Sequence, residues 1–463
     1  MFSYMKQSPG FYGKVAALAA PIVLQNLVTS ALGMADTFMV GMLGELPMAA
    51  VALANIPLFV VQLFIFGVQS GATVLLSQYW GRQDKQSINR VMGVAFWSAG
   101  LVSLSVALIL WFFPVEFLSF FGSDPAIVAL AAEYGRIAGF SYFLTSFSMV
   151  YIAAYRSMEK PQLGLYVLMV SMTCNTLLNW VLIFGKLGAP ALGVKGAALA
   201  TLISRSLEVA IVVCHSLFSR GFRLRADCLL RPGVDMTCRF LRYGGPVVCN
   251  ETLWGLGTSM FPTIMGHMEG SQEILAAYTL SGNVEKICSV VAFGLAGTAS
   301  VIIGREIGAG RGKSVYSVGL ALNTLSMLVG VGMGVVMVVF AQVVAPAWVF
   351  PLFKLSGRAA AVAAMMITVQ GVLMPLREFN TVNIVGVLRG GGDVKAATLI
   401  DLSPLWLVAI PAAFVTGLVL KLDIFWVYLG ICMEQLAKVL LGVWRLRTGR
   451  WIKDLTRTDP VKG

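Results

Sequence analysis

One aspartate lies within a long apolar stretch near the start of the chain, in the segment LGMADTFMVG at residues 32–41. Counting back from Asp36 by threes and fours along a helix reaches Gly33, Thr29 and Asn26, so this face of the helix is small and polar. None of these positions holds a basic residue that could neutralise the carboxylate. Asp36 is therefore a candidate for binding a cation or a proton. The alternative is a structural carboxylate that a neighbouring helix satisfies.

Two later segments offer neutral oxygens that could complete a site around Asp36. Asn175 and Asn179 are four residues apart, one helical turn, so their amide oxygens project from the same face, and Thr201 could add a hydroxyl. One carboxylate with three neutral oxygens suits a hard monovalent cation such as sodium, whose ligands would be Asp36, Asn175 and Asn179. The same carboxylate in a dry pocket could carry a proton instead. Both alternatives stay open. We favour the proton because the second half of the chain offers no second cluster of neutral oxygens around its acid Glu251, at the start of the seventh apolar segment.

The composition places these residues in a membrane. Of the 463 residues, 58% are hydrophobic and 12% are charged, whereas a soluble domain carries roughly 25% charged residues. Twelve apolar windows follow one another along the chain, each with at least the roughly 20 residues that cross a bilayer core. They lie near residues 15–42, 47–79, 91–113, 127–155, 162–185, 196–218, 243–266, 273–303, 315–345, 360–388, 396–420 and 425–444. The sequence therefore predicts an all-α integral membrane protein with twelve transmembrane helices.

The basic residues of the loops predict the orientation. With the N-terminus inside, the cytoplasmic segments hold 24 Lys and Arg residues and the outer loops hold five, namely Lys186, Lys195, Lys354, Arg358 and Lys421. An even number of crossings returns the C-terminus to the cytoplasm, so we expect a multi-pass protein of the cell (plasma or inner) membrane with both termini cytoplasmic. The net charge of +12 then reflects this topology and attraction to anionic lipid. Because no aromatic-basic module accompanies the charge, nucleic acid binding is not expected.

Cysteine and histidine indicate no cofactor. The seven cysteines form no CxxC pair and fall in apolar segments or in a cytoplasmic loop, so neither a disulfide framework nor a zinc site is indicated. The two histidines, His215 and His267, lie near segment ends, which argues against a histidine proton relay. Beyond a coupling ion, H⁺ or Na⁺, we expect no cofactor.

The chain repeats itself once. The motif LAAPIVLQN around Pro21 recurs as YGGPVVCNE around Pro246, the Gly-Arg of YWGRQDK recurs in IIGREIGAGRGK, and YRSMEKP recurs as LRGGGDVK, at offsets of 225, 223 and 233. Three landmarks in one order indicate two homologous lobes of six helices, a repeat that transporters use to build a central cavity. The predicted boundaries are an N-lobe at 1–218, a cytoplasmic linker at 219–238, a C-lobe at 239–447 and a cytoplasmic tail at 448–463.

Six motifs in a fixed order carry a family resemblance over residues 10–447. They are ADTFMVG, GRQDK, YRSMEKPQ, NTLLNWVLIFG, LGVKGAALAT and VGVLRGGGDVK. In these motifs and in its two lobes the chain resembles the multidrug and toxic compound extrusion (MATE) family. The resemblance implies an antiporter that exports lipophilic or cationic drugs by alternating access, from a substrate chamber between the lobes. It also implies an N-lobe site formed by an acid of the first helix and asparagines of the fifth, roles that fall on Asp36, Asn175, Asn179 and Thr201.

In the C-lobe the resemblance indicates two further acids. Glu251 lies at the start of the seventh segment, with Gly255 and Thr258 on its face, where some family members use a glutamate for coupling or for binding cationic drugs. Glu378 lies in the tenth segment, where other members carry an acid used in cation binding. This sequence departs from them by placing Arg377 beside it, so we expect Arg377 to neutralise Glu378.

The remaining intramembrane acids have structural explanations. Three have a basic residue on the same helix face at a spacing of three or four, namely Glu133 with Arg136, Glu208 with Arg205 and Glu434 with Lys438. The functional interpretation is weaker for Glu285, next to Lys286, and for Asp401, ahead of Pro404.

Three other classes of protein fit this sequence less well than an antiporter does. A flippase for lipid-linked saccharides would need a cavity rich in Arg and Lys, whereas the intramembrane basic residues here are few and mostly paired. A membrane enzyme would need a catalytic constellation at membrane depth, and none is evident. A channel would not need coupling carboxylates or repeated lobes. We therefore expect a monomeric transporter, not an enzyme, whose partners are small drug-like substrates and membrane lipids.

Overall fold

The computed structural model describes residues 3–219, 222–353 and 355–456. Four basic residues that enter the predicted loop charges lie outside this part of the chain, namely Arg220, Lys354, Arg457 and Lys462. The described residues are almost entirely helical and form no β-strand, apart from one isolated bridge between Gly392 and Ile452.

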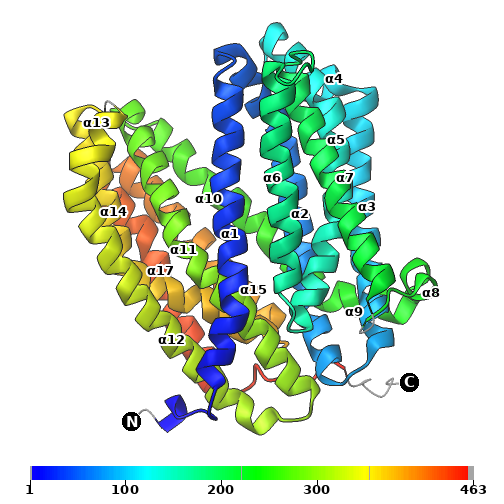
Figure 1. The fold of residues 1–463 in the computed structure, drawn as a ribbon. Helices are drawn as coiled ribbons and strands as arrows, with labels where there is room; N and C mark the ends of the chain where they lie inside the picture. Colours follow the sequence, from blue (N-terminus) through cyan, green and yellow to red (C-terminus); the bar gives the residue numbers. More distant parts are fainter. Residues whose placement is uncertain (1–2, 220–221, 354, 457–463) are drawn as a thin grey trace. The chain divides into compact units, whose positions relative to one another are not determined.

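The first half of the chain forms six long helices, which Figure 1 shows in blue to green. They are α1 (Phe11–Gly41), α2 (Glu45–Gly81), α3 (Lys85–Phe112), α5 (Pro125–Ser157), α6 (Gln162–Phe184) and α7 (Val194–Phe218). Short helices lie between or after them, namely α4 (Pro114–Ser119), α8 (Ala226–Leu230) and α9 (Val234–Tyr243). Side-chain caps start two of the long helices, because Asp84 accepts from the Ser87 amide at 3.0 Å and Asp124 from the Ala126 amide at 2.9 Å.

The second half follows the same plan with more irregular helices. Its long elements are α10 (Gly245–Gly266), α11 (Ser271–Gly308), α12 (Gly312–Val339), α14 (Gly357–Thr381), α15 (Val394–Pro404) and α17 (Ile424–Arg447). Wider π-helical turns extend three of them, as η2 (Phe340–Val349), η3 (Val382–Leu388), η4 (Leu405–Ala409) and η5 (Val415–Val419), with α13 (Phe350–Leu352) and α16 (Ile410–Phe414) between. Prolines lie in or beside several of these turns, where a missing amide hydrogen disturbs the regular ladder.

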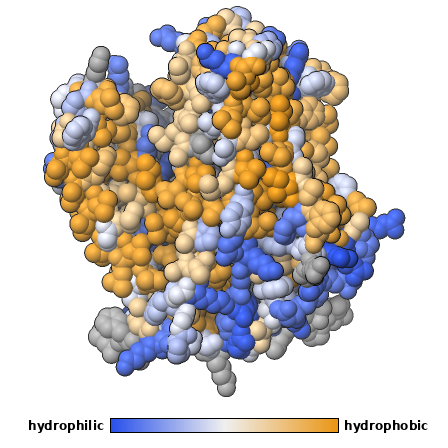
Figure 2. Space-filling view, in the orientation of Figure 1, coloured by the Kyte–Doolittle hydropathy of each residue, from blue (hydrophilic) through white to orange (hydrophobic). Residues whose placement is uncertain are grey.

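These twelve helical passages coincide with the twelve predicted segments. Eleven are long and apolar enough to cross a membrane. The other is α10, in which Asn250, Glu251 and several glycines interrupt the apolar residues. Figure 2 shows apolar side chains covering much of one face, while hydrophilic side chains gather near α8 and α9.

The described chain divides into two compact units. Unit 2 is Leu24–Val248, and unit 1 joins Met1–Val23 to Cys249–Gly463. The start of α1 therefore packs with the second half of the chain, where Val15, Leu18 and Ala19 share a buried cluster with Leu295 and Ala299 of α11. The lobe and linker boundaries expected from the repeat stay predictions.

In unit 2, α5 is the central helix. It packs against α2, α3 and α7, and α6 packs against α7. At one end, Val40 of α1, Ile183 of α6 and Val194 and Ala197 of α7 belong to one buried apolar cluster. This cluster fixes the ends of α1, α6 and α7 against one another, and these are the three helices that carry the predicted N-lobe site.

In unit 1, α14 takes the position that α5 has in unit 2. It packs against α11, α12 and α17. Glycines allow α12 and α14 to approach closely, since a Cβ atom on Gly330 would lie 2.7 Å from the Cα of Pro375 and one on Gly371 would lie 2.9 Å from the carbonyl oxygen of Gly334. The repeated packing pattern agrees with the internal repeat of the sequence.

Candidate functional site

The structure brings the four predicted N-lobe residues together in unit 2. Asn179 Nδ2 of α6 donates to Asp36 Oδ1 of α1 at 2.5 Å and also lies 3.3 Å from Asn175 Oδ1. Asn175 Nδ2 in turn lies 3.4 Å from Thr201 Oγ1 of α7, whose hydroxyl donates to the carbonyl of Ala197. The chain of contacts therefore runs from the carboxylate through two amides to a hydroxyl, across three helices.

No charged side chain of the described residues contacts the carboxylate of Asp36. Within the described chain its carboxylate makes no ion pair, and its one hydrogen bond comes from an amide. Asn179 is fully buried, and its Oδ1 has no hydrogen-bond partner among the described residues. A carboxylate beside an unused amide oxygen can accept a proton or contribute to binding a small cation. The described residues hold no group of three or more His, Cys, Asp and Glu side chains able to bind a metal ion.

The other two acids of the predicted membrane segments in the first half of the chain, Glu208 and Glu133, are paired with bases. Glu208 is fully buried, and its Oε2 lies 2.6 Å from Arg205 Nη1 and accepts from Ser171 at 3.1 Å, which confirms the predicted pair with Arg205. For Glu133 the predicted partner is wrong: its carboxylate lies 3.4 Å from Lys195 Nζ of α7, not against Arg136. A spacing of three residues on one helix could not reveal this partner on another.

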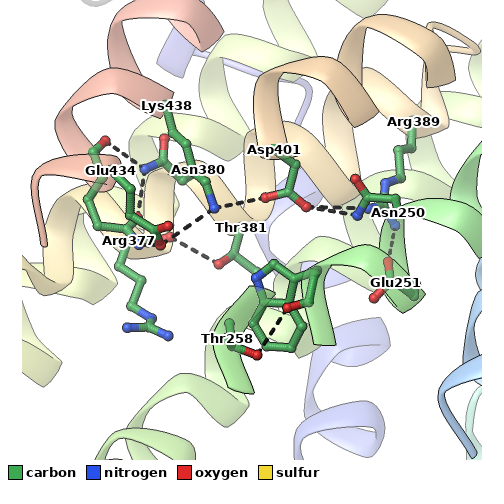
Figure 3. A network of polar contacts seen from close by, with 12 residues as sticks. Asn250, Glu251, Thr258, Arg377, Asn380, Thr381, Arg389, Asp401, Glu434 and Lys438 are labelled. Atoms are coloured by element: carbon green, nitrogen blue, oxygen red, sulfur yellow. Dashed lines mark hydrogen bonds and ion pairs between the residues drawn. The ribbon is translucent and has the colours of Figure 1, made fainter. Parts of the chain in front are cut away.

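Unit 1 contains a larger network of charges, which Figure 3 shows. Arg389, only 1% exposed, donates from Nη1 to Glu251 Oε1 at 2.7 Å, and its Nη2 lies 3.8 Å from Asp401 Oδ2. Lys438 Nζ lies between two acids, 3.0 Å from Asp401 and 3.6 Å from Glu434, which confirms the predicted Glu434 pair. Two bases thus contact three acids across α10, α15, α17 and the residue that follows η3, so this network has one more acid than bases.

Asn250 and Thr258 of α10 also lie in this region (Figure 3). Asn250 Nδ2 donates to Asp401 Oδ2 at 2.9 Å, so Asp401 is held by an amide as well as by bases. Thr258 donates to the carbonyl oxygens of Trp254 and Gly255 in its own helix and forms no hydrogen bond with Glu251. Glu251 is therefore an ion-paired residue in this structure, with Arg389 as its partner. Sequence reasoning missed Arg389, which had been counted only among the loop charges.

Glu378 and Arg377 are not partners, so the expectation that Arg377 neutralises Glu378 is wrong. Arg377 forms its ion pair with Glu285 of α11, and Gln370 Nε2 also donates to Glu285 at 2.8 Å. The Glu378 side chain is fully buried, and neither carboxyl oxygen has a hydrogen-bond partner among the described residues. Neighbouring residues of a helix point in different directions, which separates these two adjacent side chains.

Comparisons with known proteins agree with this architecture. The family model MatE matches residues 21–181 and 247–415. The "Probable multidrug resistance protein NorM" of Thermotoga maritima is 24% identical over 98% of this chain and 96% of its own length.

Among solved structures, a MOP superfamily transporter from Pyrococcus furiosus has a TM-score of 0.83 at 19% identity, covering 99% of both chains. A variant of the Vibrio cholerae MATE transporter VcmN has a TM-score of 0.82 at 18% identity, covering 94% of this chain and 95% of its own. The fold of twelve helices in two lobes is shared with these structures, and the family model spans most of both halves, so this chain belongs to the MatE family of membrane transporters.

Proposed function

We propose that this transporter is a cation-coupled antiporter that exports lipophilic or cationic drugs and toxic organic compounds by alternating access. Relatives named for multidrug resistance support the substrate class. The observation that carries the coupling role is the environment of Asp36, a carboxylate inside a membrane helix with an amide as its partner and no ion pair in the described chain. An acid that is not permanently neutralised can change its occupancy during a transport cycle.

The coupling ion that we propose is the proton. Protonation of Asp36 needs one carboxyl group and only a rotation of the Asn179 amide, which can either donate or accept a hydrogen bond. Sodium is the alternative coupling ion. It would compete with the proton for the same site, with Asp36, Asn175, Asn179 and Thr201 as oxygen ligands. The free Oδ1 of Asn179 is compatible with that alternative. Either ion is a transported species, and we propose no resident cofactor.

Glu378 is the second acid that we assign to coupling, ahead of Glu251. Its carboxyl group is buried and has no hydrogen-bond partner among the described residues, as suits a group that exchanges a proton. Glu251 is held by Arg389, so it can bind a cation or a cationic substrate only after that ion pair opens. Its role in coupling or substrate binding is therefore conditional on movement of Arg389.

The pairing of the basic residues argues against a flippase. Arg205, Arg377, Arg389 and Lys438 each contact a carboxylate, so they are not free to bind a pyrophosphate. We further propose a monomer in the cell membrane with cytoplasmic termini, in contact with lipid and small-molecule substrates and not with nucleic acid.

The test is ethidium flux in proteoliposomes under separately imposed proton and sodium gradients. Wild-type protein should move ethidium against its gradient. Asp36→Asn should keep its expression and melting temperature, because an amide fits the same polar face, and should lose gradient-driven flux. Glu133→Gln is the matched control, since it changes a half-exposed acid of the same unit. Flux by Asp36→Asn equal to that of wild type would refute the coupling role, and no flux in wild type would refute export of this substrate class.

A further inference from the structure

The chain beyond α17 folds back onto the loop that carries Arg389. Trp451 is fully buried, and its Nε1 donates to the carbonyl of Leu446 at 3.1 Å. Its ring lies so close to Gly391 that a Cβ atom on this residue would overlap it. The backbone continues the contact, because the amide of Lys453 donates to the carbonyl of Gly391 at 2.7 Å. We call residues 449–456 the C-terminal clasp.

Charges reinforce the clasp. Asp393 is only 2% exposed, and its two carboxylate oxygens lie 2.6 Å from Arg445 Nε of α17 and 2.6 Å from Lys453 Nζ of the clasp. A buried carboxylate with a base on each oxygen is strongly fixed, because losing either base would leave charge uncompensated. Asp393 therefore ties the end of the loop to α17 and to the clasp.

The loop itself consists of three glycines between Arg389 and Asp393. A run of glycines has no side chains to hold its own conformation, so its path is set by what packs against it. On one side, a Cβ atom on Gly390 would lie 2.7 Å from the Cα of Ser300 in α11. On the other side lies Trp451. The position of Arg389, and with it the ion pair to Glu251, thus depends on both supports.

The N-terminal half offers an internal comparison. Its corresponding loop is YRSMEKP, which has no run of glycines, and the counterpart of Arg389 is Arg156. Arg156 Nη2 lies 3.3 Å from the amide oxygen of Gln25, and Arg156 forms no ion pair with a carboxylate of the described residues. The combination of a glycine loop, a clasp and an arginine held on an acid is thus found in the second half.

We propose that the C-terminal clasp is a positioning element for transport: Trp451 and Lys453 hold the glycine loop so that Arg389 stays on Glu251 until the loop moves. This role rests on the proposed antiport function. Loss of the clasp should loosen the loop locally and let Arg389 leave Glu251 at the wrong stage of the cycle. The turnover of transport should then fall while the affinity for substrate stays nearly unchanged.

The test uses the full-length protein with Trp451→Ala and the milder Lys453→Met, which keeps the Trp451 packing. Trp451→Phe is the conservative rescue, and Arg450→Ala, an exposed neighbour, is the control. Hydrogen–deuterium exchange is measured on peptides spanning 386–394 and on peptides spanning 155–161. In Trp451→Ala we expect exchange about tenfold faster in 386–394 alone, with ethidium flux about tenfold slower and ethidium affinity within about twofold of wild type. Lys453→Met should change the same quantities less, and Trp451→Phe should restore most of both.

Three outcomes would overturn the proposal. The first is unchanged exchange in 386–394, since the clasp would then not hold the loop. The second is equally faster exchange in 155–161, which would indicate general destabilisation. The third is a loosened loop with wild-type flux. If Trp451→Ala does not fold, Lys453→Met decides in the same way. Absence of flux in wild type and in Arg450→Ala would refute the antiport function instead, and the exchange experiment would still decide whether the clasp holds the loop.

Discussion

The intramembrane acids differ in whether another residue neutralises them. Glu208, Glu251 and Glu285 each contact an arginine, so their charge is compensated within the protein. Asp36 and Glu378 have no such contact among the described residues, although both lie inside long helices. Since an unpaired charge is costly away from water, these two carboxyl groups are the ones most suited to carry a proton or to meet a cation.

This difference predicts effects of different size on stability when the two glutamates are replaced by glutamine. Glu378→Gln replaces a carboxyl group that has no hydrogen-bond partner in the described part of the chain with an amide of the same shape, so we expect the free energy of unfolding to change by less than about 1 kcal/mol. Glu208→Gln removes the charge that compensates Arg205 in a buried pair and should cost about 3 kcal/mol. Thermal unfolding of both variants in the same detergent tests this. A larger loss for Glu378→Gln would mean that its carboxylate has a partner that matters for stability.

At the scale of the element, α1 is continuous through Pro21, and the division between the two compact units falls two residues later. Its first part packs in the buried cluster of unit 1, while Asp36 lies in the part that belongs to unit 2. Proline removes one backbone hydrogen bond from a helix and weakens it locally. We infer that α1 bends near Pro21 when the occupancy of Asp36 changes.

Pro21→Ala should therefore affect movement more than binding. Restoring the backbone hydrogen bond stiffens α1, so we expect the flux of ethidium to fall about fivefold, a barrier rise of about 1 kcal/mol, while its affinity changes little. Initial rates in proteoliposomes and equilibrium binding in detergent give the two quantities. Pro190→Ala, in the exposed loop between α6 and α7, is the control. Equal turnover in wild type and Pro21→Ala would count against a bending step.

At the scale of the whole molecule, the sequence predicts those features that depend on the local pattern of residues. The twelve helical passages coincide with the twelve predicted apolar windows, although polar residues interrupt the one at α10, and the pairs of Glu208 and Glu434 follow from spacing along one helix. Spacing along one helix groups Asn175 with Asn179, but their approach to Asp36 rests on matching residue types and on the family resemblance, because periodicity cannot join residues 143 apart. The partners of Glu251, Glu285 and Glu133 were missed for the same reason: each lies on another element, and spacing does not tell which helix faces meet. The packing of the start of α1 with the second half was likewise not predictable.

The coupling ion is a property of the whole transporter, and it decides which species drives a complete cycle. A sodium site needs an ionised carboxylate and several oxygens at fixed distances, while a proton site needs one carboxyl group that can gain and lose its proton. The Asp36 cluster offers one carboxylate, one free amide oxygen and contacts among its other polar groups that sodium would have to break. We therefore expect ethidium efflux to follow the proton gradient, with sodium competing at Asp36.

The measurement is efflux at fixed membrane potential and equal pH on both sides, with and without an inward sodium gradient, in wild type and in Asn179→Ala. Proton coupling predicts little efflux in both proteins under sodium alone. Strong efflux driven by sodium in wild type and lost in Asn179→Ala would reverse the assignment and make the Asn179 amide oxygen a sodium ligand.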